Sequence, residues 1–185
     1  MVFFIAETHF DHENILSLFK RPFGTIEQMN EAIIENWNRK ITGNDTVYIT
    51  GDIFFRSKDP EAILRRLHGK KHLAIGNHDT WIKHVNVDKY FKKVGHYLTG
   101  TDGYHGLVMC HYPQIYFAHP KRFYAIHGHI HANTDDDIWP ALVARDHVLN
   151  ASVDINGFAP VTFDELYANN ARFKAAHSST ALKEI

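Results

Sequence analysis

Residue types that bind metal ions follow five short apolar segments of this sequence. The five segment endings are Glu7-Thr8-His9, Gly51-Asp52, Gly76-Asn77-His78-Asp79, His111 and Gly128-His129-Ile130-His131. In open α/β sheets, ligands sit in the crevice at the carboxyl ends of the strands. If each apolar segment is a strand, the five endings can therefore converge on one site.

The side chains at these endings suit a pair of divalent cations. They comprise two carboxylates, one amide and four imidazoles, namely Glu7, Asp52, Asn77, His9, His111, His129 and His131. Two dications with two carboxylates and neutral imidazoles leave a charge of roughly +2, which favours an anionic phosphate and a metal-bound hydroxide near neutral pH. Nitrogen and oxygen ligands without thiolate suit manganese, iron, nickel or zinc alike.

The spacing of the last ending sets a condition on the backbone. His129 and His131 can share one site only if the chain turns sharply after the predicted strand. We expect Gly128 to begin a tight turn that brings both imidazoles to one site.

Several other polar residues near the endings have two interpretations. His12 and Arg21 lie close to the first ending and can bind a substrate phosphate, Arg21 by a bidentate contact. Helix capping and surface pairing are the alternatives for both. The chain has 15 histidines. A histidine-rich metal-storage protein would cluster them in the sequence, whereas here the four proposed histidine ligands follow predicted strands.

Composition restricts the class of protein. A chain of 185 residues with 44% hydrophobic content is long enough for a full core, so we expect one domain, 1–185, with a polar and frayed tail over about 171–185. A formal charge of -1 argues against binding long nucleic acid mainly through a basic surface. The single cysteine, Cys110, fits a reducing compartment, and we expect a cytoplasmic protein. Nothing approaches the roughly 18 apolar residues of a membrane span.

The first half of the chain alternates predicted strands and helices. The expected elements are strands 2–6, 46–50 and 71–75, a helix at 26–40, and a helix between Asp59 and Gly69. Thr25 and Gln28 have the spacing of a capping box, which supports the start of the first helix. Two strand–helix–strand crossovers imply a parallel sheet with right-handed connections.

The second half has shorter segments and more turn residues. Predicted strands cover 93–98, 107–110, 123–127, 148–151 and 152–155. Turn-rich segments between them favour hairpins and a second, more antiparallel sheet. Thr162 and Glu165 form a capping box for a final helix. The expected architecture is two sheets face to face with helices on the outside.

The five endings, in this order, resemble the sequence blocks of the calcineurin-like metallophosphoesterase superfamily and span residues 7 to 131. The flanking phrases resemble its small bacterial and phage members: Thr8-His9-Phe10, Arg21-Pro22-Phe23, His111-Tyr112-Pro113 and Pro160-Val161-Thr162-Phe163. The resemblance implies an α/β fold, a four-layer αββα sandwich of two mixed β-sheets flanked by helices.

The resemblance also implies a role for each site residue. One metal would be held by Glu7, His9, Asp52 and His131. The other would be held by Asp52, Asn77, His111 and His129, so that Asp52 bridges the two ions. His78 would meet the phosphate and protonate the leaving group, with Asp79 orienting its imidazole.

Glu7 is the main departure from the family pattern, in which this block normally begins with Asp. The extra methylene moves the carboxylate by on the order of 1.5 Å if the backbone stays in place. From the sequence alone we therefore expect a weaker first metal site and a gain in metal occupancy or turnover in Glu7→Asp. Asp11 also stands where a glycine is common. The characteristic phrases of the Ser/Thr phosphatases and dinucleoside tetraphosphatases are absent.

These observations predict a phosphoesterase that uses two divalent metal ions. A phosphodiester of nucleotide or nucleic-acid type is favoured over a monoester, because a positioned acid such as His78 helps most when the leaving alkoxide is poor. The alternatives are a phosphomonoesterase and a binding module of the same fold that has lost catalysis, which only Glu7 supports. No membrane contact and no obligate protein partner are expected.

Overall fold

The structure is a computed structural model that describes residues 1–117, 119 and 121–178. These residues form two four-stranded sheets with the strand orders β1-β2-β3-β4 and β5-β6-β7-β8. The strands are β1 Val2–Ile5, β2 Thr46–Ile49, β3 Lys70–Ala74, β4 Phe91–Gly95, β5 Tyr97–Thr101, β6 Gly106–Cys110, β7 Phe123–His127 and β8 Val148–Asn150. The helices are α1 Ile15–Leu18, α2 Ile26–Lys40, α3 Pro60–Leu64, α4 Trp139–Val143 and α5 Phe163–Ala176, with the 3₁₀ turns η1 Asp79–Lys83 and η2 Val87–Lys89.

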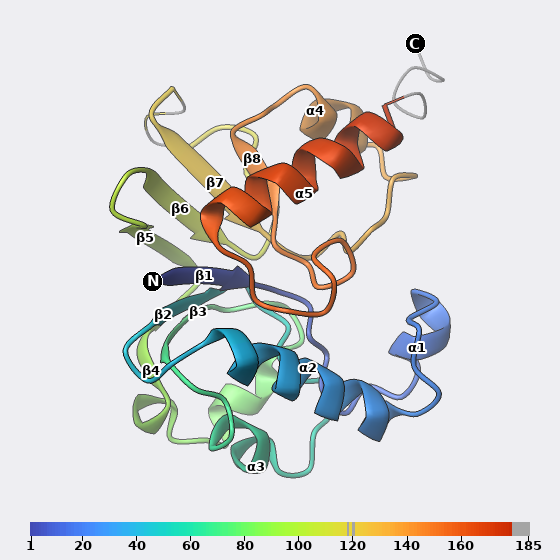
Figure 1. Cartoon of the computed structure of the whole chain (residues 1–185), viewed down its shortest axis with the longest axis vertical. Helices are drawn as coiled ribbons and strands as arrows, with labels where there is room; N and C mark the ends of the chain where they lie inside the picture. Colours follow the sequence, from blue (N-terminus) through green and yellow to red (C-terminus); the bar gives the residue numbers. More distant parts are fainter. Residues whose placement is uncertain (118, 120, 179–185) are drawn as a thin grey trace.

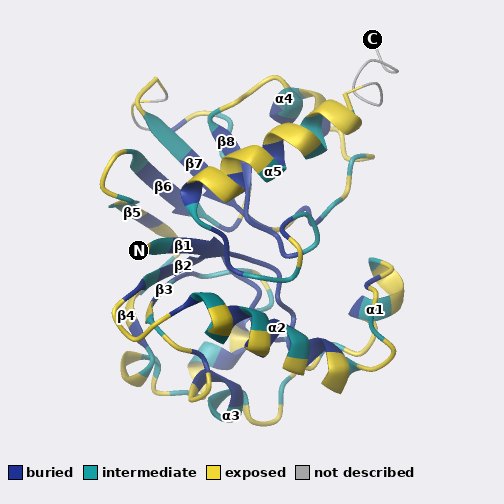
Figure 2. Cartoon of the chain, viewed as in Figure 1, coloured by how far each residue is buried: buried dark blue, intermediate teal, exposed yellow. Residues whose placement is uncertain are grey.

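The elements stack in four layers. Figure 1 shows α4 and α5 on the outer side of the second sheet and α2 and α3 on the outer side of the first sheet. Each boundary between layers has its own cluster of buried apolar side chains. Figure 2 shows buried strands in the middle and exposed outer faces on α2 and α5. This arrangement confirms the four-layer αββα sandwich.

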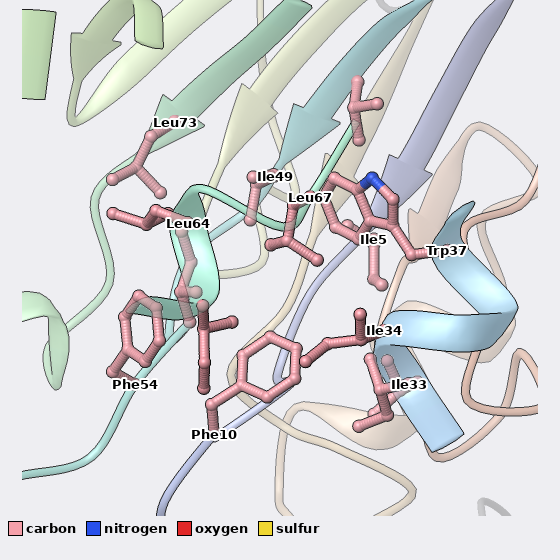
Figure 3. Close-up of a cluster of buried hydrophobic side chains, with 14 of the residues drawn as sticks. Ile5, Phe10, Ile33, Ile34, Trp37, Ile49, Phe54, Leu64, Leu67 and Leu73 are labelled. Atoms are coloured by element: carbon pink, nitrogen blue, oxygen red, sulfur yellow. The ribbon is translucent and has the colours of Figure 1, made fainter. Parts of the chain in front are cut away.

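The first sheet and α2 follow the sequence prediction. All three strand pairs of this sheet are parallel. Helix α2 covers the predicted residues, and the Thr25 side chain accepts a hydrogen bond from the Gln28 N–H. The Gln28 side chain bonds back to the N–H of Gly24, so the capping box is displaced by one residue. In Figure 3 the α2 residues Ile33, Ile34 and Trp37 face side chains of the sheet.

Helix α3 is shorter than predicted. Asp59 caps it, with its carboxylate accepting from the Ala62 N–H at 3.0 Å, but the helix ends at Leu64 and does not reach Gly69. The Lys71 ammonium donates to the carbonyls of Leu67 at 2.7 Å and Gly69 at 3.2 Å. These side-chain contacts satisfy carbonyl groups of the α3–β3 connection, beyond the end of the helix.

The predicted strand 93–98 is wrong because it joins two strands of different sheets. Strand β4 pairs with β3 in the first sheet, whereas β5 pairs with β6 in the second. A single residue, His96, separates them. The chain therefore changes sheets within one apparently continuous segment, and no Gly/Pro-rich turn marks the crossing.

The second sheet is mixed and mainly parallel, which corrects the expectation of a more antiparallel sheet, although the expected hairpin at residues 101–103 is present between β5 and β6. Only the β5–β6 pair is antiparallel, whereas β6–β7 and β7–β8 are parallel. Residues 152–155, predicted as a strand, form turns, with an isolated parallel bridge between Ser152 and Ala6. Parallel neighbours need long crossovers, and α4 lies on the one before β8.

The final helix begins where the sequence predicts and ends later. Both reciprocal bonds of the Thr162–Glu165 capping box are present. Helix α5 continues to Ala176, so residues 171–176 of the predicted frayed tail are helical, and 179–185 lie outside the described residues. Among the described helices, none has the length and apolar character needed to cross a membrane.

Candidate metal centre

The five predicted endings converge at one edge of the two sheets. Two overlapping groups of buried side chains place their ligand atoms within 4.8 Å of one another. The groups are Glu7, His9 and His131, and Glu7, Asp52 and His111. Asn77 and His129 adjoin the second group through contacts with His111. The structure thus brings together all seven residues that the sequence analysis proposed as metal ligands.

The backbone that carries these ligands adopts an uncommon conformation. Five non-glycine site residues have positive φ: Glu7 (59°), His9 (47°), Asp52 (54°), His129 (67°) and His131 (51°). Residues held in this region cost free energy and cluster at functional sites. The expected turn at Gly128 is present, since the N–H of Ile130 donates to the Gly128 carbonyl at 2.9 Å. The imidazoles of His129 and His131 both reach the site.

In the first group, nitrogen and oxygen atoms with lone pairs lie close together and are buried. The Nδ1–H of His131 donates to Asp154 Oδ2 at 2.7 Å, which leaves the lone pair of Nε2 3.1 Å from Glu7 Oε2. The Nε2 of His9 lies 3.0 Å from the same oxygen, and its buried Nδ1 has no hydrogen-bond partner among the described residues. A cation bound between the two Nε2 atoms and Glu7 Oε2 would satisfy these three atoms.

The second group also brings atoms with lone pairs close together. The Nδ1–H of His111 donates to the carbonyl of Thr50 at 3.0 Å, so its Nε2 carries a lone pair. That nitrogen lies 2.8 Å from Asn77 Oδ1 and 3.2 Å from His129 Nδ1. Converging oxygen and imidazole donors of this kind fit a divalent transition metal.

Two carboxylates lie between the groups. Asp52 Oδ2 is 3.8 Å from His9 Nε2 and 3.6 Å from His111 Nε2, which is compatible with its expected bridging role. Glu7 also spans both groups: Oε2 faces the first, whereas Oε1 accepts the N–H of His129 at 2.6 Å and lies 3.4 Å from His111 Nδ1. The longer side chain therefore reaches two sides of the site.

Burial makes the charged forms of these groups unfavourable without a cation. It raises the pKa of the Glu7 carboxyl well above its usual value, and the negative charge of Asp52 adds to this. Burial also raises the pKa of Asp52 and lowers the pKa of His9 and His129. Bound dications would reverse these tendencies, because they favour ionised carboxylates and neutral imidazoles.

Asp79 has a different role from the expected one. Its buried carboxylate accepts hydrogen bonds from the N–H groups of Asp52 (2.9 Å), Ile53 (2.9 Å) and Gly76 (2.8 Å) and from Trp81 Nε1 (2.8 Å). These contacts fix the loops after β2 and β3, and they do not include the imidazole of His78. The expectation that Asp79 orients His78 is therefore corrected.

His78 stands at the border of the two groups. Its N–H donates to Asp52 Oδ1 at 2.8 Å, and its half-buried ring lies 5.5 Å from the ring of His9 and 5.0 Å from that of Phe55. The imidazole is thus close to the candidate ligands, and its distance from a phosphate depends on the bound substrate.

The two candidate substrate-binding residues differ in their surroundings. Arg21 is only 4% exposed, and its guanidinium is occupied by Asp154 and by the backbone carbonyls of Glu7 and Thr8, so the expected substrate contact is wrong. His12 is half-buried and stacks on Phe55 with 4.0 Å between ring centroids. His12 stays a candidate.

Asp154 is the site residue that the sequence analysis missed. Burial pushes the pKa of its carboxyl upward, but hydrogen bonds from His131 and Arg21 and the charge of Arg21 outweigh burial and lower it. Asp154 follows a predicted strand at 148–151 in the same way as the other site residues follow theirs. The prediction of a further strand at 152–155 concealed that signal.

Comparisons with known proteins agree with this geometry. The model of the calcineurin-like phosphoesterase family matches residues 1–178. An uncharacterized protein of Methanocaldococcus jannaschii is 31% identical over 166 residues, which cover 88% of this chain and 87% of that protein. A crystal structure of a protein of unknown function from Aquifex aeolicus matches with a TM-score of 0.70 and 28% identity, over 89% of this chain and 96% of that chain. Pseudomonas putida nuclease MPE matches at a TM-score of 0.47 with 20% identity, over 70% of this chain and 61% of that chain, which is too distant to support a functional argument.

Proposed function

This chain belongs to the calcineurin-like phosphoesterase family, and we propose that it hydrolyses a phosphodiester of nucleotide or nucleic-acid type with two divalent metal ions. The observation that carries the proposal is the convergence of buried lone pairs into two adjoining groups that share the Glu7 carboxylate, with the Asp52 carboxylate near the imidazoles of both. Burying this set of carboxylates and imidazoles costs free energy unless cations bind between them.

We divide the residues between the two ions as the family resemblance implies. The first ion would be held by Glu7, His9, Asp52 and His131, and the second by Asp52, Asn77, His111 and His129. When bound, divalent cations supply positive charge and Lewis acidity at a phosphoryl oxygen. Manganese, iron, nickel and zinc all suit these ligands.

His78 is the residue that we assign to proton transfer. Its ring borders His9 and is half-buried, so it can face both solvent and a bound ester. A proton donated to the leaving oxygen matters most for the poor leaving groups of natural diesters. This assignment favours the diesterase over the monoesterase.

The competing hypothesis of a non-catalytic binding module rested on Glu7. In the structure Glu7 contacts members of both groups and accepts a backbone hydrogen bond, so the site is built around a glutamate. This observation favours the enzyme.

Aromatic side chains next to the site support an aromatic substrate such as a nucleotide. Phe55 is half-buried, contacts the rings of His12 and His78, and has the Arg56 guanidinium 5.2 Å from its ring centre. Tyr112 is 48% exposed and lies 4.6 Å from the ring of His129. Neither ring belongs to the three hydrophobic clusters of the described residues. An exposed ring such as Tyr112 can stack on a nucleobase, and Phe55 adds a partly exposed ring beside His78.

Metal analysis and a substrate panel test the proposal. We expect about two divalent ions per chain and metal-dependent hydrolysis of bis-p-nitrophenyl phosphate and short oligonucleotides that exceeds hydrolysis of p-nitrophenyl phosphate. The Asp52→Asn variant controls for contaminating phosphatases. Full activity in metal-free protein would exclude the metal mechanism, and preference for the monoester would favour the phosphomonoesterase.

The aromatic residues are tested separately. In Phe55→Leu and Tyr112→Leu we expect KM for an oligonucleotide to rise about 5- to 150-fold, since stacking contributes about 1–3 kcal/mol per base. Tyr104→Leu is the matched control. Tyr104 is 93% exposed and lies in the β5–β6 turn, whereas the metal centre lies at the opposite end of β6. Equal KM values in all three variants would remove the stacking argument.

A further inference from the structure

Arg21 and Asp154 form a buried ion pair behind the first metal group. The Arg21 side chain is 0% exposed and that of Asp154 is 5% exposed. The contact is a two-pronged fork, with Nε 2.8 Å from Oδ1 and Nη2 3.0 Å from Oδ2. Bidentate geometry of this kind fixes orientation as well as distance.

The rest of the Arg21 guanidinium holds the loop that follows β1. Nη2 donates to the carbonyl of Glu7 at 2.7 Å, and Nη1 donates to the carbonyl of Thr8 at 3.0 Å. These carbonyls lie between the two positive-φ residues Glu7 and His9. The guanidinium therefore stabilises the unusual backbone conformation that aims both side chains at the site.

Asp154 extends the same network to His131. Its Oδ2 accepts hydrogen bonds from His131 Nδ1 at 2.7 Å and from Ser152 Oγ at 2.9 Å. The bond from His131 fixes the ring orientation and leaves the Nε2 lone pair facing Glu7. Replacing a carboxylate that accepts a hydrogen bond from a metal-binding histidine typically lowers metal affinity 10- to 100-fold.

We propose that Arg21 and Asp154 act together as positioning residues for the first metal site. They bind no metal or substrate themselves, but together they aim Glu7, His9 and His131. This inference rests on the metal centre of the proposed function, and it adds that the first site depends on a buried ion pair from two distant parts of the chain.

The two groups share Glu7, but the second group also has supports of its own, so the proposal predicts a larger effect at the first site. His111 is fixed by the Thr50 carbonyl, and the backbone of Asp52 and Gly76 by the Asp79 carboxylate. In the described part of the chain, neither Arg21 nor Asp154 hydrogen-bonds to His111, Asn77 or His129.

Calorimetric titration of metal-free protein with Mn²⁺ tests the asymmetry. The variants are Asp154→Asn and Arg21→Lys, which keep side-chain size but break the fork. We expect one of two binding events to weaken about 10- to 100-fold while the other weakens less. Arg66→Lys is the matched control, because Arg66 forms a similar two-pronged pair with Glu31 on the surface.

A charge-free variant separates positioning from folding. Removing one partner leaves an uncompensated buried charge and can unfold the chain. The double variant Arg21→Met with Asp154→Leu removes both charges and keeps apolar volume. If the pair only stabilises the fold, this variant binds both ions with wild-type affinity; if it positions ligands, the first site stays weak in folded protein.

Nitrogen NMR of the histidine rings gives a readout that needs no metal. In metal-free wild type we expect His131 to carry its proton on Nδ1, and in the double variant we expect exchange between both tautomers. An unchanged His131 tautomer together with two unchanged affinities would overturn the positioning role while leaving the metal centre intact. Wild-type protein that binds no Mn²⁺ would overturn the proposed function and this inference together.

Discussion

At the residue scale, Glu7 shows how one extra methylene can be used by a metal site. Oε2 faces His9 and His131, whereas Oε1 accepts the backbone N–H of His129. A shorter carboxylate at the same backbone position cannot reach both sides. The contacts therefore indicate that shortening Glu7 to aspartate lowers metal affinity, although the family pattern taken alone indicates that it raises it.

The first prediction is that Glu7→Asp weakens the first metal site by about 10- to 100-fold, the range typical when a supporting contact of a metal site is lost. Calorimetric titration with Mn²⁺ beside an activity assay measures it. Tighter metal binding in Glu7→Asp would show that the loop relaxes around aspartate, as the family pattern suggests.

The second prediction distinguishes a ligand from an acid. Asp52→Asn should lose metal and activity together, whereas His78→Ala should keep its metal. General acid catalysis contributes about 10²- to 10⁴-fold, so the rate loss in His78→Ala should shrink as the leaving group becomes more acidic. A series of aryl diesters measures this, and an equal loss across the series would remove His78 from proton transfer.

At the element scale, the turn after β7 depends on a glycine for steric reasons. A Cβ on Gly128 would lie 2.4 Å from Glu7 Oε1 and 2.9 Å from the Thr50 carbonyl oxygen. The turn therefore packs its backbone directly against a candidate ligand.

The third prediction is that Gly128→Ala displaces Glu7, lowers metal affinity and destabilises the fold by about 1–3 kcal/mol, as overpacking typically does. Thermal unfolding and metal titration measure the two effects. Gly43→Ala is the control, because nothing lies within 4 Å of a Cβ at that position. Equal behaviour of the two variants would contradict the steric argument.

The junction of α3 and β3 carries a buried lysine with pH-dependent consequences. Burial lowers the pKa of Lys71 from 10.5 to about 8. Between these values the unfolded chain binds the proton and the folded chain does not, so stability rises with pH. Below pH 8 both states are protonated and the contribution is constant.

The fourth prediction compares wild type with Lys71→Met between pH 8 and 10.5. The free energy of unfolding of wild type should rise relative to the variant by as much as about 3 kcal/mol, since one pKa unit corresponds to about 1.4 kcal/mol. Denaturant unfolding across this range measures it. A pH-independent difference would show that the Lys71 ammonium stays charged in the folded protein.

At the scale of the whole molecule, the metal centre and the hydrophobic cores are distinct. The site lies at the strand ends, whereas the apolar clusters fill the spaces between the four layers. Folding free energy from apolar burial does not depend on bound metal. The sandwich should therefore persist without cations.

The fifth prediction is that chelation abolishes turnover but leaves the circular dichroism spectrum of the protein largely unchanged. Restoring Mn²⁺ at 100 times its dissociation constant should stabilise the fold by about 2.7 kcal/mol for each site. Thermal scans with and without metal measure the shift. Unfolding on chelation would show that the metal sites hold the sandwich together.

The sequence by itself determined the local features. Short-range signals placed α2, the caps at Asp59 and Thr162, and the polar endings of the strands, because caps, periodicity and turn residues act over a few residues. The order of the five endings also identified the family, since each ligand type is set by the chemistry of the metal and not by packing.

Only the tertiary structure decided the contacts between distant residues. The Arg21–Asp154 pair joins residues 133 positions apart, and Asp79 accepts N–H groups from the loop after β2. The division of 93–98 between two sheets is likewise invisible locally, because β4 and β5 differ in partner and not in pattern. Pairing and buried polar contacts depend on which surfaces the fold brings together, and local propensity does not specify that choice.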